Sequence, residues 1–187
     1  RTRFLSGNEL ARLGKVLIQV EQDGSESAHA LAAFRLLLLT GCRLSEIQKL
    51  KWAWVDLDEM EIRLPDSKTG AKSVYLGEAA IDVFKKVPKV AGNPFVIVGK
   101  KPGAYLTDMQ RPWRRIRKLA ELEDVRIHDL RHTFASGGLV VGEGLSMIGK
   151  LLGHTQIQTT ARYAHLANDP IKAAATKIAS RLAEALG

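Results

Sequence analysis

Residues 54–76 read WVDLDEMEIRLPDSKTGAKSVYL, and this stretch decides the fold class of the 187-residue chain. It holds three short β-like runs, WVDLD, EIRLP and KSVYL, which are separated by turn-forming residues such as DSKTG. Runs of this length, bounded by Asp, Gly, Ser and Pro, are typical of strands joined by tight turns. We therefore predict three antiparallel strands that form one small sheet.

The sequence on both sides of these strands has the pattern of helices. SGNE at residues 6–9 is a capping box for a helix over 7–20. A largely apolar helix over 26–40 ends at Gly41, a residue suited to a left-handed helix end, and RLSEIQKLK then predicts a short helix. After the sheet, helices are predicted over residues 78–87, 107–120, 128–138, 144–151, 155–163 and 170–185. The predicted fold class is α+β, a mainly helical domain with a small three-stranded antiparallel sheet.

Composition narrows the class of protein. The length and the 45% of hydrophobic residues suit one domain with a buried core. No apolar run approaches the ~20 residues of a membrane span. The net charge of +8 favours a polyanionic partner, most commonly nucleic acid, although a protein can be basic without such a partner. The single cysteine, Cys42, excludes a disulfide framework and a zinc site built on cysteine thiolates, so we expect a cytoplasmic location.

Four segments carry polar or basic residues where a buried pattern would have apolar ones: TGCRLSEI, DSKTG, HDLRHTFAS and LLGHTQIQTTARYAHL. Each has a simple structural interpretation when it is taken alone. Arg43 can pair with Glu46, and Lys68 can be a solvated lysine in a hairpin turn. His128 and His132, at positions i and i+4 of a helix, can bind a metal, but the general-base Glu of the metalloprotease pattern is missing beside the first histidine.

Taken together, the four segments hold the side chains needed for phosphoryl transfer without a metal. Two guanidinium groups can clamp the non-bridging oxygens of a phosphodiester, as a divalent ion does elsewhere. A histidine can act as general acid or base near neutral pH, and a lysine can protonate a leaving oxygen. A tyrosine hydroxyl can attack phosphorus and become the covalent carrier. The set therefore favours a phosphoryl-transfer site.

The motifs TGCRLSEI, SKTG, HDLRHTFAS, LGHT and ARYAHL, in this order, resemble the catalytic domain of the tyrosine recombinases, the phage integrase family. The resemblance runs from about residue 5 to residue 170. The sequence is further similar to those of integrases from prophages and genomic islands. The resemblance implies the tyrosine recombinase catalytic fold. It also implies a site-specific recombinase that integrates or excises a mobile element by cutting and rejoining DNA.

The resemblance implies that four residues hold the phosphate or support the site. Arg43 and Arg131 bind the scissile phosphate, and His154 forms a hydrogen bond with it. Glu46 orients or supports these groups.

Three further residues carry the chemistry that the resemblance implies. Tyr163 is the nucleophile and forms a 3′-phosphotyrosine, while Lys68 donates a proton to the leaving 5′ oxygen. His128 assists as acid or base on the tyrosine and during rejoining. The pattern gives His132 packing or a hydrogen bond, and His165 a structural role.

The resemblance also implies partners, cofactors and a division into domains. The implied reaction requires no metal, and it requires no ATP because a phosphotyrosine keeps the energy of the phosphodiester. The expected partner is double-stranded DNA at attachment sites, bound by a tetramer of the full-length protein, with accessory bending or excision factors possible and a nucleoid-associated location. Residues 1–5 are expected to end a linker, 6–169 to form the catalytic domain and 170–187 to form a helix that docks in cis or in trans. N-terminal core-binding and arm-binding domains are expected to be missing.

Two other functions share part of this pattern. A type IB topoisomerase uses the same kind of site, but the LGHT motif argues against it. A catalytically silent DNA-binding module is the second alternative. Every catalytic-type position is filled in this sequence, which argues against such decay.

Overall fold

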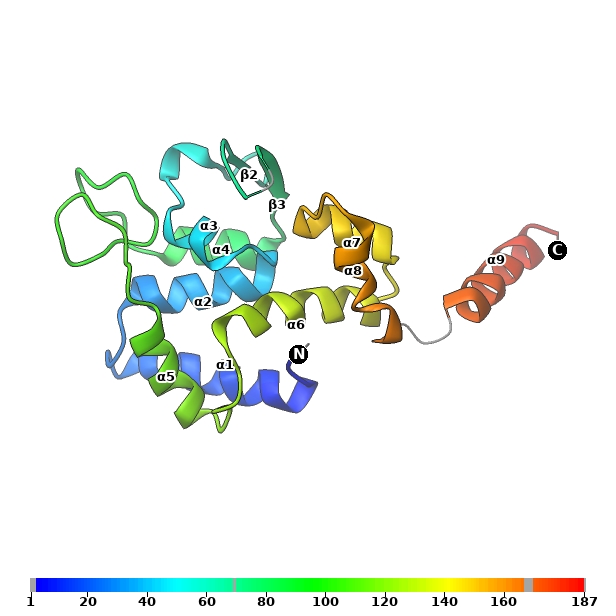
Figure 1. Ribbon diagram of the computed structural model, residues 1–187, viewed down its shortest axis with the longest axis horizontal. Coiled ribbons are helices and arrows are strands. Elements are labelled where there is room, and N and C mark those ends of the chain that lie inside the picture. The colour runs from blue at the N-terminus through cyan, green and yellow to red at the C-terminus, as the bar shows by residue number, and fades with distance from the viewer. Residues whose placement is uncertain (1–2, 69, 167–169, 187) are drawn as a thin grey trace.

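The computed structural model describes residues 3–68, 70–166 and 170–186 (Figure 1). The described helices before the sheet are α1 (Gly7–Gln22), α2 (Ala28–Thr40), α3 (Leu44–Gln48) and the short η1 (Trp52–Trp54). The strands are β1 (Val55–Asp56), β2 (Glu61–Leu64) and β3 (Lys72–Tyr75). The later helices are α4 (Glu78–Lys86), α5 (Gln110–Leu119), α6 (Ile127–Val140), α7 (Leu145–Leu152), α8 (Ile157–Ala161), η2 (Ala164–Leu166) and α9 (Pro170–Leu186).

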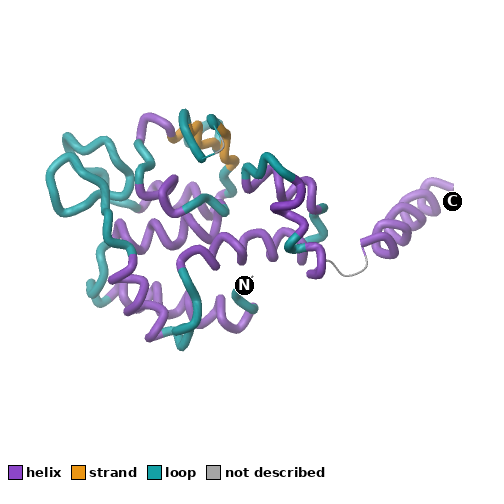
Figure 2. The backbone as a smooth tube through the Cα atoms, in the orientation of Figure 1, coloured by secondary structure: helices purple, strands orange, loops and turns teal. Residues whose placement is uncertain are grey.

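The three strands form the predicted antiparallel sheet, in the order β1-β2-β3. Figure 2 shows this sheet as a small orange patch on a molecule that is otherwise helices and loops. Ile62 of β2 lies opposite Val74 of β3, and both are buried, while Arg63 and Tyr75 face solvent. This alternation gives the sheet one face on the core and one face in water. The predicted α+β fold class is confirmed.

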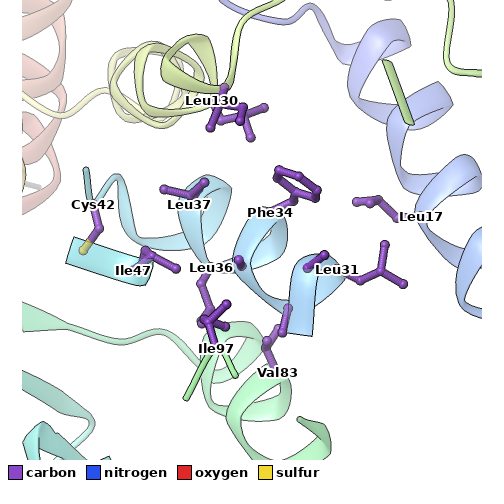
Figure 3. Packing of buried hydrophobic residues seen from close by; sticks show 14 of the residues in the cluster. Leu17, Leu31, Phe34, Leu36, Leu37, Cys42, Ile47, Val83, Ile97 and Leu130 are labelled. Carbon is purple, nitrogen blue, oxygen red and sulfur yellow. The ribbon is translucent and has the colours of Figure 1, made fainter. Parts of the chain in front are cut away.

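Helix α2 lies at the centre of the hydrophobic core. It is apolar almost all round, and eight of its thirteen residues are buried. Such a helix is stable only when other elements cover every side of it. Figure 3 shows this cover: Leu17 of α1, Val83 of α4 and Leu130 of α6 surround Phe34 and the leucines of α2.

The predicted signals for helix starts and stops are present around α1 and α2. Ser6 and Glu9 form the capping box of α1, since the Ser6 side chain accepts from the Glu9 N–H and the Glu9 carboxylate accepts from the Ser6 N–H. Gly41 ends α2 with a left-handed φ of 64°. The chain turns there, and Arg43 is the N-cap residue immediately before α3. The turn at Gly41 thus fixes where Arg43 stands.

One predicted helix ends earlier than expected. The sequence predicts a helix over 155–163, but α8 ends at Ala161, and Tyr163 lies in the turn that follows. The Tyr163 N–H donates to the carbonyl of Thr160 at 3.0 Å, so the chain tightens after α8. The prediction that Tyr163 is helical is wrong. The tight turn carries the ring into a small second cluster with Ala135 of α6 and Ile148 of α7.

Helix α9 lies to one side of the body in Figure 1. Its described side chains from 174 to 184 are exposed, including Ile178 and Leu182 of the predicted apolar stripe. The side chains of Ile171 and Leu186 lie outside the described residues, as do residues 1–2 of the expected linker and residues 167–169 at the expected boundary. The division into domains stays a prediction. Within the described part of the chain, no helix is long and apolar enough to cross a bilayer.

Substitution of Gly41 tests the close approach of α2 to α6 and α7. A Cβ at Gly41 would overlap the Phe134 ring and lie 2.9 Å from Leu152 Cδ2, whereas a Cβ at Gly24, also with a left-handed φ, would meet nothing within 4 Å. We expect Gly24→Ala to lower the free energy of unfolding by about 1–2 kcal/mol, from the left-handed backbone alone. Gly41→Ala should lower it by roughly 2–5 kcal/mol, because overpacking adds to that strain.

Urea denaturation of both variants at 25 °C measures the difference. Equal losses for Gly41→Ala and Gly24→Ala would contradict the close approach of these helices.

Candidate active site

Arg43 is held at the start of α3 by Glu46. The Arg43 backbone N–H donates to Glu46 Oε2 at 2.7 Å, and its Nη1 donates to Glu46 Oε1 at 2.9 Å. The ion pair that the sequence allowed is therefore present. Lys72, at the start of β3, donates from Nζ to the same carboxylate at 2.9 Å. Glu46 thus bridges a helix start and a strand start, and it fixes the Arg43 guanidinium between them.

The Glu46 carboxylate is ionised despite its burial. Its side chain is only 5% exposed, and burial alone would raise its pKa. The hydrogen bond from the Arg43 backbone and the Lys72 ammonium outweigh this effect, and the net pKa of Glu46 is lowered. One buried negative charge is therefore shared by two neighbouring cations, Arg43 and Lys72, and a net positive charge remains.

The Arg131 guanidinium is buried and bound to two carbonyl groups. Nη1 donates to the Gly41 carbonyl at 2.5 Å and Nη2 donates to the Leu152 carbonyl at 2.8 Å. Both carbonyls stand at the C-terminal ends of helices, α2 and α7, where intrahelical partners are lacking and the helix dipole is negative. Burial, then the nearby Arg43 guanidinium, lower the pKa of Arg131, although arginine stays protonated at neutral pH. Two guanidinium groups this close favour an anion between them.

His154 lies beside these arginines, in the loop between α7 and α8. Its Nδ1 is 2.8 Å from Oγ1 of Thr160, a buried residue of α8. Burial, followed by the charges of Arg131 and Arg43, lowers the pKa of His154 to about 4. His154 is therefore neutral at physiological pH. A neutral imidazole fixed by Thr160 can form a hydrogen bond with a bound anion without adding further positive charge.

Tyr163 is buried, and its hydroxyl meets a histidine. The residue is 1% exposed and packs against Ala135, Ile148 and Leu152. Its hydroxyl oxygen lies 2.5 Å from Nδ1 of His132. Burial raises the pKa of Tyr163, while the charges of Arg131 and Arg162 oppose that rise. The ring thus packs like a core residue, but its hydroxyl lies within the field of the site arginines.

His128 and His132 occupy successive turns of α6. Their rings meet edge to face, with 4.8 Å between centroids. His128 is exposed, whereas His132 is buried and stands next to Tyr163. Burial, then the Arg131 charge, lowers the pKa of His128. In the described part of the chain, the histidine that shares a hydrogen bond with the Tyr163 hydroxyl is His132 and not His128.

Lys68 has no hydrogen bond or ion pair to the other predicted site residues within the described part of the chain. It is exposed on the turn between β2 and β3, and Ser67 tightens this turn by donating to the Gly70 carbonyl at 2.6 Å. Thr69 of the SKTG motif lies outside the described residues. The lysine that contacts the cluster is Lys72, through Glu46. The role of Lys68 stays a prediction.

The sequence interpretation missed two residues that hold the site together. Lys72 had a readable signal, since alternation in KSVYL puts it on the same face of β3 as buried Val74, and a lysine on a buried face needs a partner. Thr160 had no comparable signal, because its contact with His154 depends on how α8 packs against α7. Arg162, exposed and adjacent to Tyr163, was also overlooked as a charge acting on the Tyr163 hydroxyl.

No cluster of three or more His, Cys, Asp or Glu side chains suited to a metal ion occurs among residues 3–68, 70–166 and 170–186. The pair His128 and His132, weighed as metal ligands, meet edge to face instead, and Nδ1 of His132 is engaged by Tyr163. The chemistry that this arrangement can perform is the binding of an anion by guanidinium groups beside a tyrosine hydroxyl.

Comparison with known proteins gives a consistent set of relatives. Residues 3–169 match the model of the Phage integrase family. The tyrosine recombinase XerA of Saccharolobus solfataricus is 32% identical over 168 residues, which cover 88% of this chain and 55% of the relative. The catalytic domain of bacteriophage HP1 integrase superposes with a TM-score of 0.70 at 27% identity, and covers 94% of this chain and 95% of that domain.

A third match is the site-specific recombinase XerH, solved in a pre-cleavage complex with its difH substrate. It superposes with a TM-score of 0.73 at 22% identity, over 94% of this chain and 54% of that chain. The fold is therefore that of tyrosine recombinase catalytic domains. The chain spans a little over half the length of the curated relatives it matches.

Proposed function

Because the chain belongs to the phage integrase family, we propose that it cuts and rejoins DNA as the catalytic domain of a site-specific recombinase. The covalent intermediate is a 3′-phosphotyrosine on Tyr163. The observation that carries this proposal is the position of the Arg131 guanidinium, which acts electrostatically on both the Arg43 guanidinium and the Tyr163 hydroxyl. A phosphodiester held by the two arginines would lie beside the tyrosine.

The two arginines hold the scissile phosphate through its non-bridging oxygens. Glu46 fixes Arg43, and the carbonyls of Gly41 and Leu152 fix Arg131, so neither guanidinium has to be ordered when DNA binds. Such preorganised cations stabilise the charge that builds on the oxygens in the transition state. His154, neutral and held by Thr160, adds a hydrogen bond to the same phosphate.

The chemistry is a transesterification. The Tyr163 oxygen attacks phosphorus, the bond from phosphorus to the 5′ oxygen breaks, and Lys68 gives that leaving oxygen a proton. Lys68 is exposed on the β2–β3 turn, so DNA bound across the site would meet it there. The phosphotyrosine keeps the energy of the phosphodiester, and a 5′-hydroxyl from a second strand reverses the reaction. His128 takes part in this rejoining as acid or base.

Double-stranded DNA at attachment sites is the proposed substrate. The net charge of +8 suits a polyanion, and the related fold of XerH has been solved with its DNA substrate. The exposed Ile178 and Leu182 of α9 support docking of this helix on a second copy of the chain, within a tetramer assembled on DNA. The full-length protein is proposed to integrate or excise a mobile element, together with accessory factors that bend DNA or direct excision.

The central test is covalent capture of DNA. The chain is incubated with a nicked suicide duplex of its attachment site and then resolved on a denaturing gel. We expect the wild type to form a denaturant-stable adduct and Tyr163→Phe to form none, because only the hydroxyl is lost. Tyr75→Phe is the matched control, since Tyr75 is 70% exposed on β3 and outside every motif, and it should react like the wild type. An adduct from the Tyr163→Phe chain would show that the nucleophile is misassigned.

A second test separates Lys68 from Lys72. An alcohol leaving group has a pKa of roughly 15, near that of water, and it needs a proton. A sulfur leaving group has a pKa of about 8.5 in a cysteine-like thiol and needs none. Lys68→Ala should therefore be severely slow on normal DNA and largely recover on a 5′-bridging phosphorothiolate. Lys72→Met should be equally defective on both substrates, because Lys72 acts through Glu46 on the arginine clamp.

Single-turnover cleavage rates on the two substrates give these ratios. Recovery of Lys72→Met instead of Lys68→Ala on the phosphorothiolate would transfer the role of general acid to Lys72.

A further inference from the structure

We propose that His132 is the general base that receives the proton of Tyr163 during cleavage. This proposal rests on the proposed function, and it gives His132 a catalytic role instead of the structural one that the sequence suggested. His132 is the side chain in contact with the reacting oxygen, at 2.5 Å from Nδ1. This is slightly shorter than the heavy-atom distance of about 2.6–3.2 Å at which general acids and bases transfer protons.

The contact is fixed on both sides by packing. His132 is 5% exposed on α6, and Tyr163 is 1% exposed in the turn after α8. The two rings lie 5.7 Å apart between centroids, and the tyrosine ring is enclosed by Ala135, Ile148 and Leu152. Burial on both sides thus holds the two rings against each other. In the tautomer that the proposal requires, the Tyr163 hydroxyl donates its proton to Nδ1 before DNA arrives.

His132 is in the protonation state that a base requires. Burial, followed by the neighbouring His128, lowers its pKa to about 4, so the imidazole is neutral at physiological pH. A neutral imidazole that accepts at Nδ1 carries its own proton on Nε2. The other groups that face it are Asp129, which raises its pKa, and Arg162 and Arg131, which lower it. A scissile phosphate bound by the arginines would add a negative charge and favour the imidazolium.

The proposed step is balanced in protons and bonds. The bond between the Tyr163 oxygen and phosphorus forms as the tyrosine O–H breaks, and its proton passes to Nδ1 of His132. The bond from phosphorus to the 5′ oxygen breaks with its electron pair, and that oxygen takes a proton from Lys68. In rejoining, the steps run in reverse: the attacking 5′-hydroxyl gives its proton to Lys68 with the help of His128, and His132 returns the proton to Tyr163.

His128 is the competing candidate for this role, since the resemblance gave it the tyrosine as one of its targets. It stands one helical turn before His132, is exposed, and meets the His132 ring edge to face at 4.8 Å. The described ring contacts run from His128 to His132 and from His132 to Tyr163. This order, with His132 in the middle, distinguishes the two histidines experimentally.

Asparagine substitutions provide the test. In His132→Asn the amide oxygen occupies roughly the place of Nδ1 and can accept a hydrogen bond, but it cannot take a proton. We expect single-turnover cleavage of the suicide duplex to slow by about 100-fold or more, the usual contribution of a general base. His165→Asn is the matched control, because His165 is exposed two residues after Tyr163, and its rate should equal that of the wild type.

A more acidic hydroxyl at position 163 distinguishes two roles of His132, proton transfer and the positioning of the tyrosine. With difluorotyrosine incorporated at position 163, the hydroxyl loses its proton more readily and needs less help from a base. The rate ratio of wild type to His132→Asn should then shrink by about tenfold or more, whereas the same ratio for His128→Asn should stay unchanged. A ratio for His132→Asn that is equal with both nucleophiles would reduce His132 to a structural role and overturn the proposal.

Two further outcomes also decide the matter. Faster cleavage by His132→Asn would mean that the hydrogen bond restrains the tyrosine, which contradicts the proposal. Absence of any adduct from the wild type would instead refute the proposed function itself.

Nitrogen-15 NMR tests the proposal on the wild-type protein, so it does not depend on whether a variant folds. We expect the His132 ring to be neutral, with no proton on Nδ1 and a proton on Nε2. A proton on Nδ1 would exclude His132 as the base.

Discussion

The burial of the Arg131 guanidinium is the constraint on which the rest of the site depends. A charged group inside a protein is costly unless its N–H groups find acceptors. Here the carbonyls of Gly41 and Leu152 supply them, at the ends of two helices whose last carbonyls lack partners of their own. The side chain extends from α6, so one guanidinium joins α2, α6 and α7. Helices α6 and α7 also pack around Tyr163, so the same two helices position the Tyr163 ring and the Arg131 cation.

The balance of charge in the site indicates that an anion binds there. Arg43 and Lys72 share one buried carboxylate, Glu46, and Arg131 is bound to two neutral carbonyls, which leaves an excess of positive charge. The buried His132 and the half-buried His154 do not add to this excess, because desolvation lowers the pKa of each to about 4. A phosphodiester would supply the missing negative charge. Its arrival would also make His132 more basic, which couples substrate binding to deprotonation of the nucleophile.

Much of this arrangement could be predicted from the sequence, because it is encoded locally. The capping box at Ser6, the left-handed Gly41 and the three strand runs are short-range signals, and each is found where it was expected. The partners of Lys72 and His132 could not be predicted in this way. They depend on which faces of β3 and α6 meet the rest of the protein, and on a tight turn that takes Tyr163 out of its helix.

The central claim is that the Tyr163 oxygen becomes bonded to DNA. The most direct measurement is mass spectrometry of the adduct after nuclease and trypsin digestion. The chain has three tyrosines, at 75, 105 and 163, and trypsin separates them into different peptides. The account predicts a nucleotide attached to Tyr163 alone, through a 3′-phosphate. A nucleotide on the peptide of Tyr75 or Tyr105, or on any residue other than a tyrosine, would contradict it.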